Sequence, residues 1–408
     1  ARAEEEMGCG GNWIEGGSTR EGSVVNSPNS FTEVDTMTLL ASPNRTFEQT
    51  ELLWNLAGGQ SPFLGPSMPH IESVPVVGDG SGGVYVLQCS GQPGLFDDTD
   101  DQPFKTIFKP LDEERFERRG IEAGTGALRE EAAFVIDKLC GGQANVPVTA
   151  RASVEDKGVR KRGSVQQYVP TCGPVENFGM PRSLEEAVRM VPLDDAQAVA
   201  CLDIRVFNTD RHPGNLLLVG ERPHKAACID HGCVLPAWWA LDCAQFDAWL
   251  GWPQVRAPPS PATVSLVKEA VEQLPETLEE LERLELSTQA QWTLRICTLW
   301  LQRAVLTHCL PLRSIALLMV RTDPREPCWL EHQVAQACRE AAISSKFVPE
   351  GKYQDLVFNV DHKFLQAFAL GKAEWAKRSE KLFFSALDAL FSSEKAKDEA
   401  LEAENYWL

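Results

Sequence analysis

Residues 206–233 read VFNTDRHPGNLLLVGERPHKAACIDHGC and place two aspartates and an asparagine at set intervals between apolar runs. Asn215 follows Asp210 by five residues, and Asp230 precedes Gly232 after the second apolar run. Carboxylate and amide oxygens are ligands that Mg²⁺ accepts together with the phosphates of a nucleotide. The segment therefore predicts a site that holds Mg-ATP for phosphoryl transfer, and other parts of the chain have to complete it.

Two simpler explanations compete with this prediction. NTD and PGN are good turn formers, and IDHG could be an aspartate that closes a strand before a glycine turn. Together, however, they have the Asp, Asn and Asp-x-Gly spacing of kinase catalytic loops, which favours the phosphate site. A zinc site built from His212 and His231 with Cys228 or Cys233 is the third alternative, but the spacing of a closed zinc site is absent.

Composition sets outer limits on the class of protein. The chain is 43% hydrophobic and 24% charged, which is typical of a globular protein, and its net charge of -19 disfavours binding to nucleic acid. No apolar run approaches the ~20 residues that a membrane-spanning helix needs. The twelve cysteines are scattered without a C-x-x-C pair, so we expect a cytoplasmic protein with at most peripheral membrane contact. The start, ARAEEE, could alternatively be the stub of a removed transit peptide, which would place the protein in an organelle.

The pattern along the chain predicts an α+β architecture in four parts. Residues 1–65 are rich in Gly, Ser, Asn and Pro and read as an extended N-terminal arm. Short β-type runs with one helical stretch follow over 66–180, and helical spacing dominates 181–345. Residues 346–408 read as a C-terminal amphipathic helical extension. The arm and this extension are candidate surfaces for a protein partner.

Glycines that precede a strand-like run suggest how the phosphates are covered. The stretch VPVVGDGSGGVYVLQC contains G-x-G-x-x-G, but a Rossmann site needs a helix after the glycines, and VYVLQC is strand-like. A hairpin whose backbone N–H groups bind phosphate fits better. The residues expected to contact the nucleotide here are Gly78, Gly80, Ser81, Gly82 and Gly83.

A lysine and an acidic partner should complete the phosphate site. FKTIFKP carries Lys109 on a predicted strand, and Lys105 lies on the same face two alternations earlier. The following helix, LREEAAF, offers Glu130 or Glu131 as the partner. Most lysines are merely solvated, so this interpretation depends on the whole constellation.

Several of these motifs together resemble a known family. The motifs GSGGVY, FKPLDEE, REEAAFVID, GSVQQYVP, LDIRVFNTDRHPGN, IDHGCVLP and WLGWPQ are similar to the phosphatidylinositol 3- and 4-kinase catalytic domain, and most of all to the plant-type gamma phosphatidylinositol 4-kinases. The similarity runs from about residue 70 to 345. It implies a bilobal protein-kinase-like fold with a small β-rich N-lobe, a hinge, and a helical C-lobe.

The resemblance also implies roles for single residues. Lys109 would bind the α- and β-phosphates of ATP and pair with Glu130. The hinge QQYVP would meet the adenine through backbone groups of Gln167 and Val169, although Gln167 stands where that hinge is usually acidic. The remaining implied roles are proton handling at the substrate hydroxyl by Asp210 and His212, and Mg²⁺ binding by Asn215 and Asp230.

The sequence says less about the molecule that accepts the phosphate. Residues 233–255 contain no Lys or Arg, which argues against multiply phosphorylated inositol lipids. Unphosphorylated phosphatidylinositol is the expected acceptor. A protein hydroxyl as acceptor, and a structural role for the fold in a larger assembly, are the alternatives.

Two other groups of residues each have two possible explanations. The tryptophans at 238, 239, 249 and 252 could insert into a membrane interface or pack internally, and the basic cluster at 157–162 could be a solvated hairpin tip or steer lipid headgroups.

Overall fold

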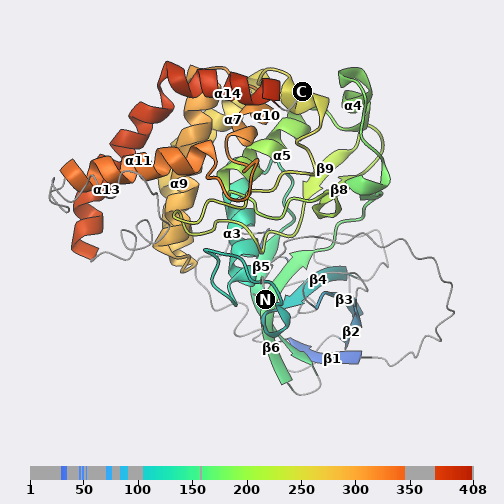
Figure 1. Ribbon diagram of the computed structural model, residues 1–408. Coiled ribbons are helices and arrows are strands. Elements are labelled where there is room, and N and C mark those ends of the chain that lie inside the picture. Colours follow the sequence, from blue (N-terminus) through green and yellow to red (C-terminus); the bar gives the residue numbers. More distant parts are fainter. Residues whose placement is uncertain are drawn as a thin grey trace, which may run out of the picture.

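The structure is a computed structural model that describes residues 29–34, 46, 48–49, 52, 70–75, 83–90, 104–156, 159–344 and 373–406. Its strands and helices are largely segregated. Six strands gather at one end of the molecule, and most helices lie at the other, with one helix between them (Figure 1). The predicted α+β class is confirmed.

Six antiparallel strands close into a small barrel in the order β1-β2-β3-β4-β6-β5. Its interior is built from alternate residues of the strands: Leu87, Phe108, Val154 and Val165 are fully buried there. Closure follows because β1 pairs with both β2 and β5, so each of these strands has two neighbours. The strands are β1 (Asn29–Val34), β2 (His70–Pro75), β3 (Tyr85–Ser90), β4 (Phe104–Pro110), β5 (Thr149–Asp156) and β6 (Val159–Gln167).

Part of the expected N-terminal arm belongs to this barrel. Strand β1 lies within residues 1–65 and supplies the closing strand. Gln49 is buried, and its Nε2 donates to Thr149 O at 2.8 Å and to Glu131 Oε1 at 3.1 Å. These residues of the segment therefore pack against the chain's own domain, while the boundaries proposed for the four parts stay a prediction.

Helix α3 (Gly126–Lys138) connects the barrel to the helical part. Eleven of its residues, from Gly126 to Asp137, are buried, because the helix has neighbours on nearly every side. Both Ala132 and Ile136 are fully buried. A helix enclosed in this way can hold acidic side chains only where they are paired, which constrains the two glutamates at its centre.

A three-stranded antiparallel sheet follows, in the order β7 (Gly173–Pro174), β8 (Leu216–Val219) and β9 (Lys225–Cys228). It carries the 206–233 segment: the 3-10 turn η3 (Pro213–Asn215) leads into β8, and Asp230 follows β9. The sheet packs beside α5 (Leu193–Arg205), so a short hairpin fixes the spacing between the asparagine and the second aspartate.

The helical part surrounds one large apolar core. Serine N-caps mark three of its helices, since Ser183, Ser260 and Ser287 each accept a backbone N–H three residues on. The remaining elements are η1 (Leu111–Glu113), η2 (Val175–Asn177), α4 (Leu184–Met190), α6 (Pro253–Arg256), α7 (Pro261–Glu272), α8 (Leu274–Arg283), α9 (Thr288–Gln302), the π-turn η4 (Arg303–Thr307), α10 (Leu312–Leu317) and α11 (Trp329–Ser344).

The tryptophan question is settled in favour of packing. Trp238, Trp249 and Trp252 are at most 2% exposed, and Trp239 is partly buried against the same core. The basic cluster is also partly engaged, because Lys161 forms ion pairs with Glu113 and Asp112. None of the described helices combines the length and apolarity needed to cross a membrane.

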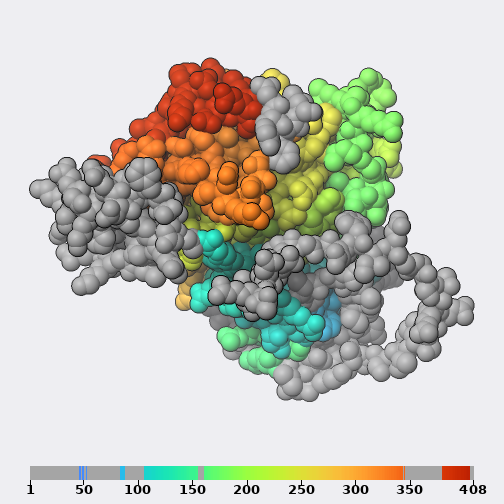
Figure 2. Space-filling view, viewed as in Figure 1, coloured from blue at the N-terminus to red at the C-terminus, as the bar shows by residue number. Residues whose placement is uncertain are grey.

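Helices α13 (Ala373–Phe391) and α14 (Glu394–Tyr406) form the C-terminal extension. They lie over α11, α9 and α10 and make up the red surface of the molecule in Figure 2. Phe383 is fully buried and stacks on Trp292 with ring centroids 5.3 Å apart. Three ion pairs reinforce this contact: Arg295–Glu380, Arg303–Asp388 and Arg313–Glu404. The apolar face of α13 is thus covered by the chain's own helices.

Candidate active site

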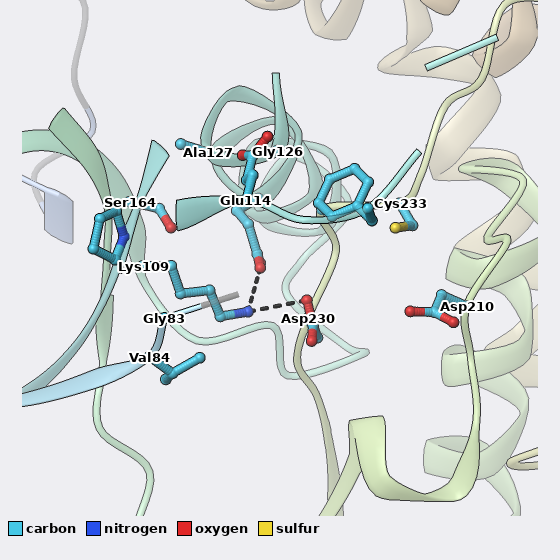
Figure 3. Close-up of a pocket in the computed structure, with 14 residues that line it drawn as sticks. Gly83, Val84, Lys109, Glu114, Gly126, Ala127, Ser164, Asp210, Asp230 and Cys233 are labelled. Carbon is cyan, nitrogen blue, oxygen red and sulfur yellow. Dashed lines mark hydrogen bonds and ion pairs between the residues drawn. The ribbon is translucent and has the colours of Figure 1, made fainter. Parts of the chain in front are cut away.

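A lysine and two carboxylates from three separate elements meet between the barrel and the helical part (Figure 3). Lys109 Nζ, at the end of β4, lies 2.5 Å from Glu130 Oε1 on α3 and 3.1 Å from Asp230 Oδ1 after β9. The neighbouring Glu131 instead binds Arg151 at 2.6 Å. The sequence left Glu130 and Glu131 open as the acidic partner, and the structure pairs Lys109 with Glu130. Lys105, on the same strand, is exposed.

Charge and burial work against each other in this group. Burial alone would lower the pKa of Lys109, but the carboxylates of Asp230 and Glu130 outweigh it and raise that pKa. The positive charge of Lys109 lowers the pKa of Asp230, whereas burial raises the pKa of Glu130. Lys109 is thus held as a cation at the base of the cleft, where it can meet phosphate oxygens.

Asp230 occupies its place through an uncommon backbone conformation. Its φ is +59°, a region in which Asp is tolerated better than most residues because its short side chain can bond locally. The left-handed turn redirects the chain after β9, so that the side chain faces Lys109 while the next residue turns inward. His231 is fully buried there, and its backbone N–H donates to Glu130 Oε2 at 3.0 Å.

The loop of residues 208–215 is held by its own hydrogen bonds. Asp210 N donates to Asn208 Oδ1 at 2.9 Å, and Asn215 Nδ2 donates to Asp210 O at 3.0 Å. The second bond orients the amide of Asn215 so that Oδ1 is the atom available to a cation. His212 Nδ1 accepts from Gly214 N at 3.1 Å. Burial raises the pKa of Asp210, which suits a group that accepts a proton near neutral pH.

Arg211 anchors this loop to the core. Its guanidinium is fully buried and donates to Asp203 at 3.0 Å, to Ile229 O at 2.8 Å and to Asn215 O. Trp249 Nε1 donates to the same carboxylate at 2.8 Å. The side chain of Arg211 therefore connects Asn215 to Ile229, the residue before Asp230. These contacts give Arg211 a structural role.

A pocket that is partly open to solvent lies over this group. Five of the residues predicted for the site line it: Gly83, Lys109 and Glu130 from the predicted nucleotide contacts, Asp210 from the predicted catalytic pair, and Asp230 from the predicted metal ligands. In the view of Figure 3, Asp230 lies between Lys109 and Asp210. The pocket thus brings the ammonium group of Lys109 and the carboxylates of Glu114, Glu130, Asp210 and Asp230 into a single cleft.

Other expected residues are not part of the pocket lining. Asn215 and His212 lie in the loop beside it, and Gln167 is exposed with its N–H donated to Val148 O at 2.8 Å. Val169 is partly buried outside the lining residues. Contact of Gln167 and Val169 with adenine therefore stays a prediction. The remaining four, Gly78, Gly80, Ser81 and Gly82, lie outside the described residues.

The sequence analysis gave no individual role to three further lining residues, two of which lie between β4 and α3 and one on β6. Glu114, Phe116 and Ser164 line the pocket as well. Glu114 Oε2 accepts from Gly124 N at 3.1 Å near the start of α3, and Arg118 Nη2 lies 3.3 Å from Asp210 Oδ1. The stretch LDEERFERRG shows no period and many charges, so only its position after the lysine strand could have pointed to the site.

The donor set suits a metal that arrives with phosphate. Among the described residues, no three His, Cys, Asp or Glu side chains lie close enough together to hold a metal ion. His231 Nε2 contacts Arg211 Nη2 at 2.9 Å, so that ring nitrogen is already engaged. Asn215 Oδ1 and Asp230 offer two oxygens, which is enough for Mg²⁺ when phosphates and water supply the rest. The residues present therefore fit Mg-ATP better than zinc.

No protein-family model matches the chain. It is 34% identical over 277 residues to phosphatidylinositol 4-kinase gamma 4 of Oryza sativa subsp. japonica, a match that covers 61% of this chain and 45% of the rice protein. It is 30% identical over 300 residues to phosphatidylinositol 4-kinase gamma 4 of Arabidopsis thaliana, with 65% and 49% covered. Phosphatidylinositol 4-kinase gamma 3 of the same plant is 28% identical over 300 residues, with 64% and 49% covered. The chain spans about half the length of these curated relatives. The resemblance drawn from the motifs is thus confirmed: this chain is similar to the plant gamma-type phosphatidylinositol 4-kinases.

Proposed function

We propose that the chain is an ATP- and Mg²⁺-dependent kinase that transfers the γ-phosphate to a hydroxyl of phosphatidylinositol. The barrel and α3 would form the small lobe of a bilobal kinase fold, and the helices from α4 onward the large lobe. The observation that carries the proposal is the contact of Lys109 Nζ with both Glu130 and Asp230 inside a pocket that Asp210 also lines. A fixed cation beside a metal-binding carboxylate is what phosphoryl transfer requires.

Each residue would have a distinct task. Lys109 would bind the α- and β-phosphates, and Asn215 with Asp230 would hold Mg²⁺, which when bound neutralises charge on the transferred group. Asp210 would orient the inositol hydroxyl and accept its proton, with His212 beside it in the same loop. Gly83 and the glycines before it would cover the phosphates with backbone N–H groups.

The choice of acceptor rests on the relatives and on charge. The matched plant proteins are named phosphatidylinositol 4-kinases. The absence of Lys and Arg from residues 233–255 favours an acceptor that carries no phosphomonoester. Transfer to a protein Ser or Thr hydroxyl uses the same cleft, so a protein acceptor is the alternative to be tested. Such a kinase would contact membranes only peripherally.

A titration with Mg-ATP tests the first half of the proposal. We expect saturable binding that depends on Mg²⁺ and that Asp230→Asn weakens by at least about tenfold, because a charged metal ligand is lost. The matched control is Asp242→Asn, which removes a carboxylate that pairs with Arg119 outside the predicted metal site. A folded wild-type chain that binds no nucleotide would instead favour a structural role in an assembly.

Transfer assays test the second half. Labelled ATP is supplied with phosphatidylinositol vesicles or with a mixture of protein acceptors, and lipid and protein fractions are separated afterwards. Label in phosphatidylinositol monophosphate supports the lipid kinase. Label found in protein alone would overturn the lipid assignment and leave the kinase assignment standing.

A further inference from the structure

Two consecutive arginines pair with acidic residues, one of which, Asp210, lines the pocket. Arg118 Nη2 is 3.3 Å from Asp210 Oδ1, and Arg119 forms an ion pair with Asp242. The side chains of Arg118 and Arg119 are 41% and 39% exposed, so both can still reach a ligand. They come from the segment between β4 and α3, which lies far in sequence from the loop of residues 208–215 that carries Asp210.

The backbone beside these arginines is fixed. Gly120 O accepts from Ala237 N at 2.7 Å, and Ile121 N donates to Arg118 O at 3.0 Å. Gly120 has a φ of +74°, and a Cβ on it would lie 2.5 Å from Ala240 Cβ, so only glycine fits this close approach. The two guanidinium groups are therefore presented from a rigid turn that is packed against residues 237–240.

Local charge shows why cations are needed at this position. Residues 233–255 carry Asp242 and Asp247 but no Lys or Arg, and the chain as a whole has a net charge of -19. An anionic acceptor that approaches Asp210 would thus meet several carboxylates. At short range such repulsion is large unless a cation offsets it.

A third arginine belongs to the same neighbourhood. Burial raises the pKa of the Cys243 thiol to about 11, and the charges of Arg118, Arg119 and Arg321 act in the opposite direction. Arg321 is already engaged, because its Nε and Nη2 both bind Glu331, at 2.7 and 2.5 Å. Arg118 and Arg119 remain more exposed than Arg321, and Arg118 contacts Asp210, which lines the pocket.

We propose that Arg118 and Arg119 bind the phosphodiester of the acceptor's inositol headgroup and so place its inositol ring at Asp210. The inference rests on the proposed function. Guanidinium groups suit this task because their forked donors match two phosphate oxygens. When the phosphodiester binds Arg118, the guanidinium group exchanges its contact with Asp210 for one with the phosphodiester. The carboxylate of Asp210 is then free to accept the proton of the inositol hydroxyl.

Two soluble analogues of the headgroup test whether the arginines bind the phosphodiester or only obstruct the site. Glycerophosphoinositol contains the phosphodiester, whereas myo-inositol has the same ring without it. Dissociation constants for both are measured by NMR titration in the presence of Mg²⁺ and a non-hydrolysable ATP analogue. The proteins compared are the wild type, Arg118→Gln/Arg119→Gln, and Arg283→Gln, which removes an arginine paired within its own helix.

We expect the double variant to lose affinity for glycerophosphoinositol by at least about tenfold, as removal of charge-assisted hydrogen bonds implies, with no change for myo-inositol or nucleotide. Arg283→Gln should match the wild type. Equal affinities for glycerophosphoinositol in all three proteins, or no binding by the wild type, would overturn the inference. Tighter binding by the double variant would also overturn it, since the arginines would then only obstruct the site.

Transfer to phosphatidylinositol vesicles in the same proteins keeps the two proposals apart. If the wild type transfers phosphate and the double variant has a raised KM for lipid with an unchanged KM for ATP, both proposals are supported. If the wild type transfers nothing to lipid yet binds glycerophosphoinositol through the arginines, the proposed function fails while the binding site stands.

Discussion

Lys109 Nζ lies 2.5 Å from Glu130 Oε1, and this contact joins the last residues of a barrel strand to the centre of helix α3. The Glu130 side chain is 3% exposed, so its charge depends on that lysine for compensation. The pair therefore has two separable effects. It stabilises the junction between barrel and helices, and it presents a cation to the pocket.

Lys109→Met should impair both effects. Loss of the ammonium leaves Glu130 and Asp230 without their shared cation, and we expect the free energy of unfolding to fall by about 2 kcal/mol. Mg-ATP binding should be lost as well. Urea denaturation and nucleotide titration measure the two effects independently.

A double variant separates stability from binding. In Lys109→Met/Glu130→Gln the buried charge is gone, and the amide oxygen can still accept from His231 N, which donates to Glu130 in the wild type. We expect most of the lost stability to return, whereas nucleotide binding stays absent. A double variant that is no more stable than Lys109→Met would show that the buried carboxylate is not the source of the loss.

Arg211→Lys should be strongly destabilising although it keeps the charge. The guanidinium donates to Asp203, Asn215 O and Ile229 O at once, and a single ammonium cannot reach all of them. We expect a loss of about 3 kcal/mol or more in the free energy of unfolding, since a buried carboxylate and two carbonyls lose donors.

Arg205→Lys is the matched control for this prediction. Arg205 is also buried, but it bonds to Cys140 Sγ and Thr298 Oγ1, and its Nη2 has no partner among the described residues. Arg205→Lys should lower the free energy of unfolding clearly less than Arg211→Lys does. Equal losses at the two positions would mean that burial of the side chain, and not the hydrogen-bond network, sets the cost.

The spacing of Asp210, Asn215 and Asp230 predicted part of the candidate site, because these residues lie close together in sequence and short elements connect them. The hairpin of β8 and β9 separates Asn215 from Asp230, and Ile229 N donates to Asn215 O at 3.2 Å. Asp210 is joined to Asn215 by the hydrogen bond from Asn215 Nδ2 to its carbonyl. Lys109 and Glu130 were harder to pair, since neighbouring Glu131 has the same charge and only packing decides which one faces the strand.

His231 should make the stability of the protein depend on pH. It is fully buried, and because Arg211 can only donate, its Nε2 must accept, which requires a neutral ring. Burial is the main reason that its pKa lies well below 6.5 in the folded chain. As pH falls below about 6.5, the unfolded chain binds this proton and the folded chain does not. Stability that is present above that pH is therefore lost toward pH 5.

The expected slope is about 1.4 kcal/mol per pH unit from this group. Chemical denaturation between pH 7 and pH 5 measures it, with His231→Gln as the comparison, since glutamine can accept from Arg211 without titrating. The difference in slope between the two proteins is the contribution of His231. Identical slopes would show that the histidine is protonated in the folded chain.

The C-terminal extension should contribute to global stability through one face of α13. Phe383 is fully buried against Trp238 and Trp292, so Phe383→Ala should lower the free energy of unfolding by about 3–5 kcal/mol. Leu382 is 38% exposed on the same helix, and Leu382→Ala should change it by less than about 1 kcal/mol. Denaturation of both variants measures the contrast. Small effects at both positions would indicate that α13 is not part of the cooperative fold.

Long-range contacts account for what the sequence could not reveal. Strand β1 lies in a stretch rich in turn-forming residues and gains its place only by pairing with β2 and β5. Arg118 reaches Asp210 across 92 residues of sequence, and no local periodicity marks it. The apolar face of α13 was visible in the sequence, but whether it covers its own domain or another chain is decided by complementary side chains such as Arg295 and Glu380.

Asp210→Asn should separate catalysis from nucleotide binding. The loop around Asp210 is held through its backbone, since its N–H donates to Asn208 and its carbonyl accepts from Asn215. Replacement of the carboxylate by an amide therefore leaves the loop in place and removes the proton acceptor. We expect transfer to fall by at least about 100-fold, the range for loss of a general base. The Kd for Mg-ATP should stay close to that of the wild type, because the predicted metal ligands are unchanged. Asp230→Asn provides the contrast, with transfer and Mg-ATP binding both reduced. An Asp210→Asn protein that transfers phosphate at the wild-type rate would assign proton acceptance to another group, and His212 in the same loop would be the next residue to replace.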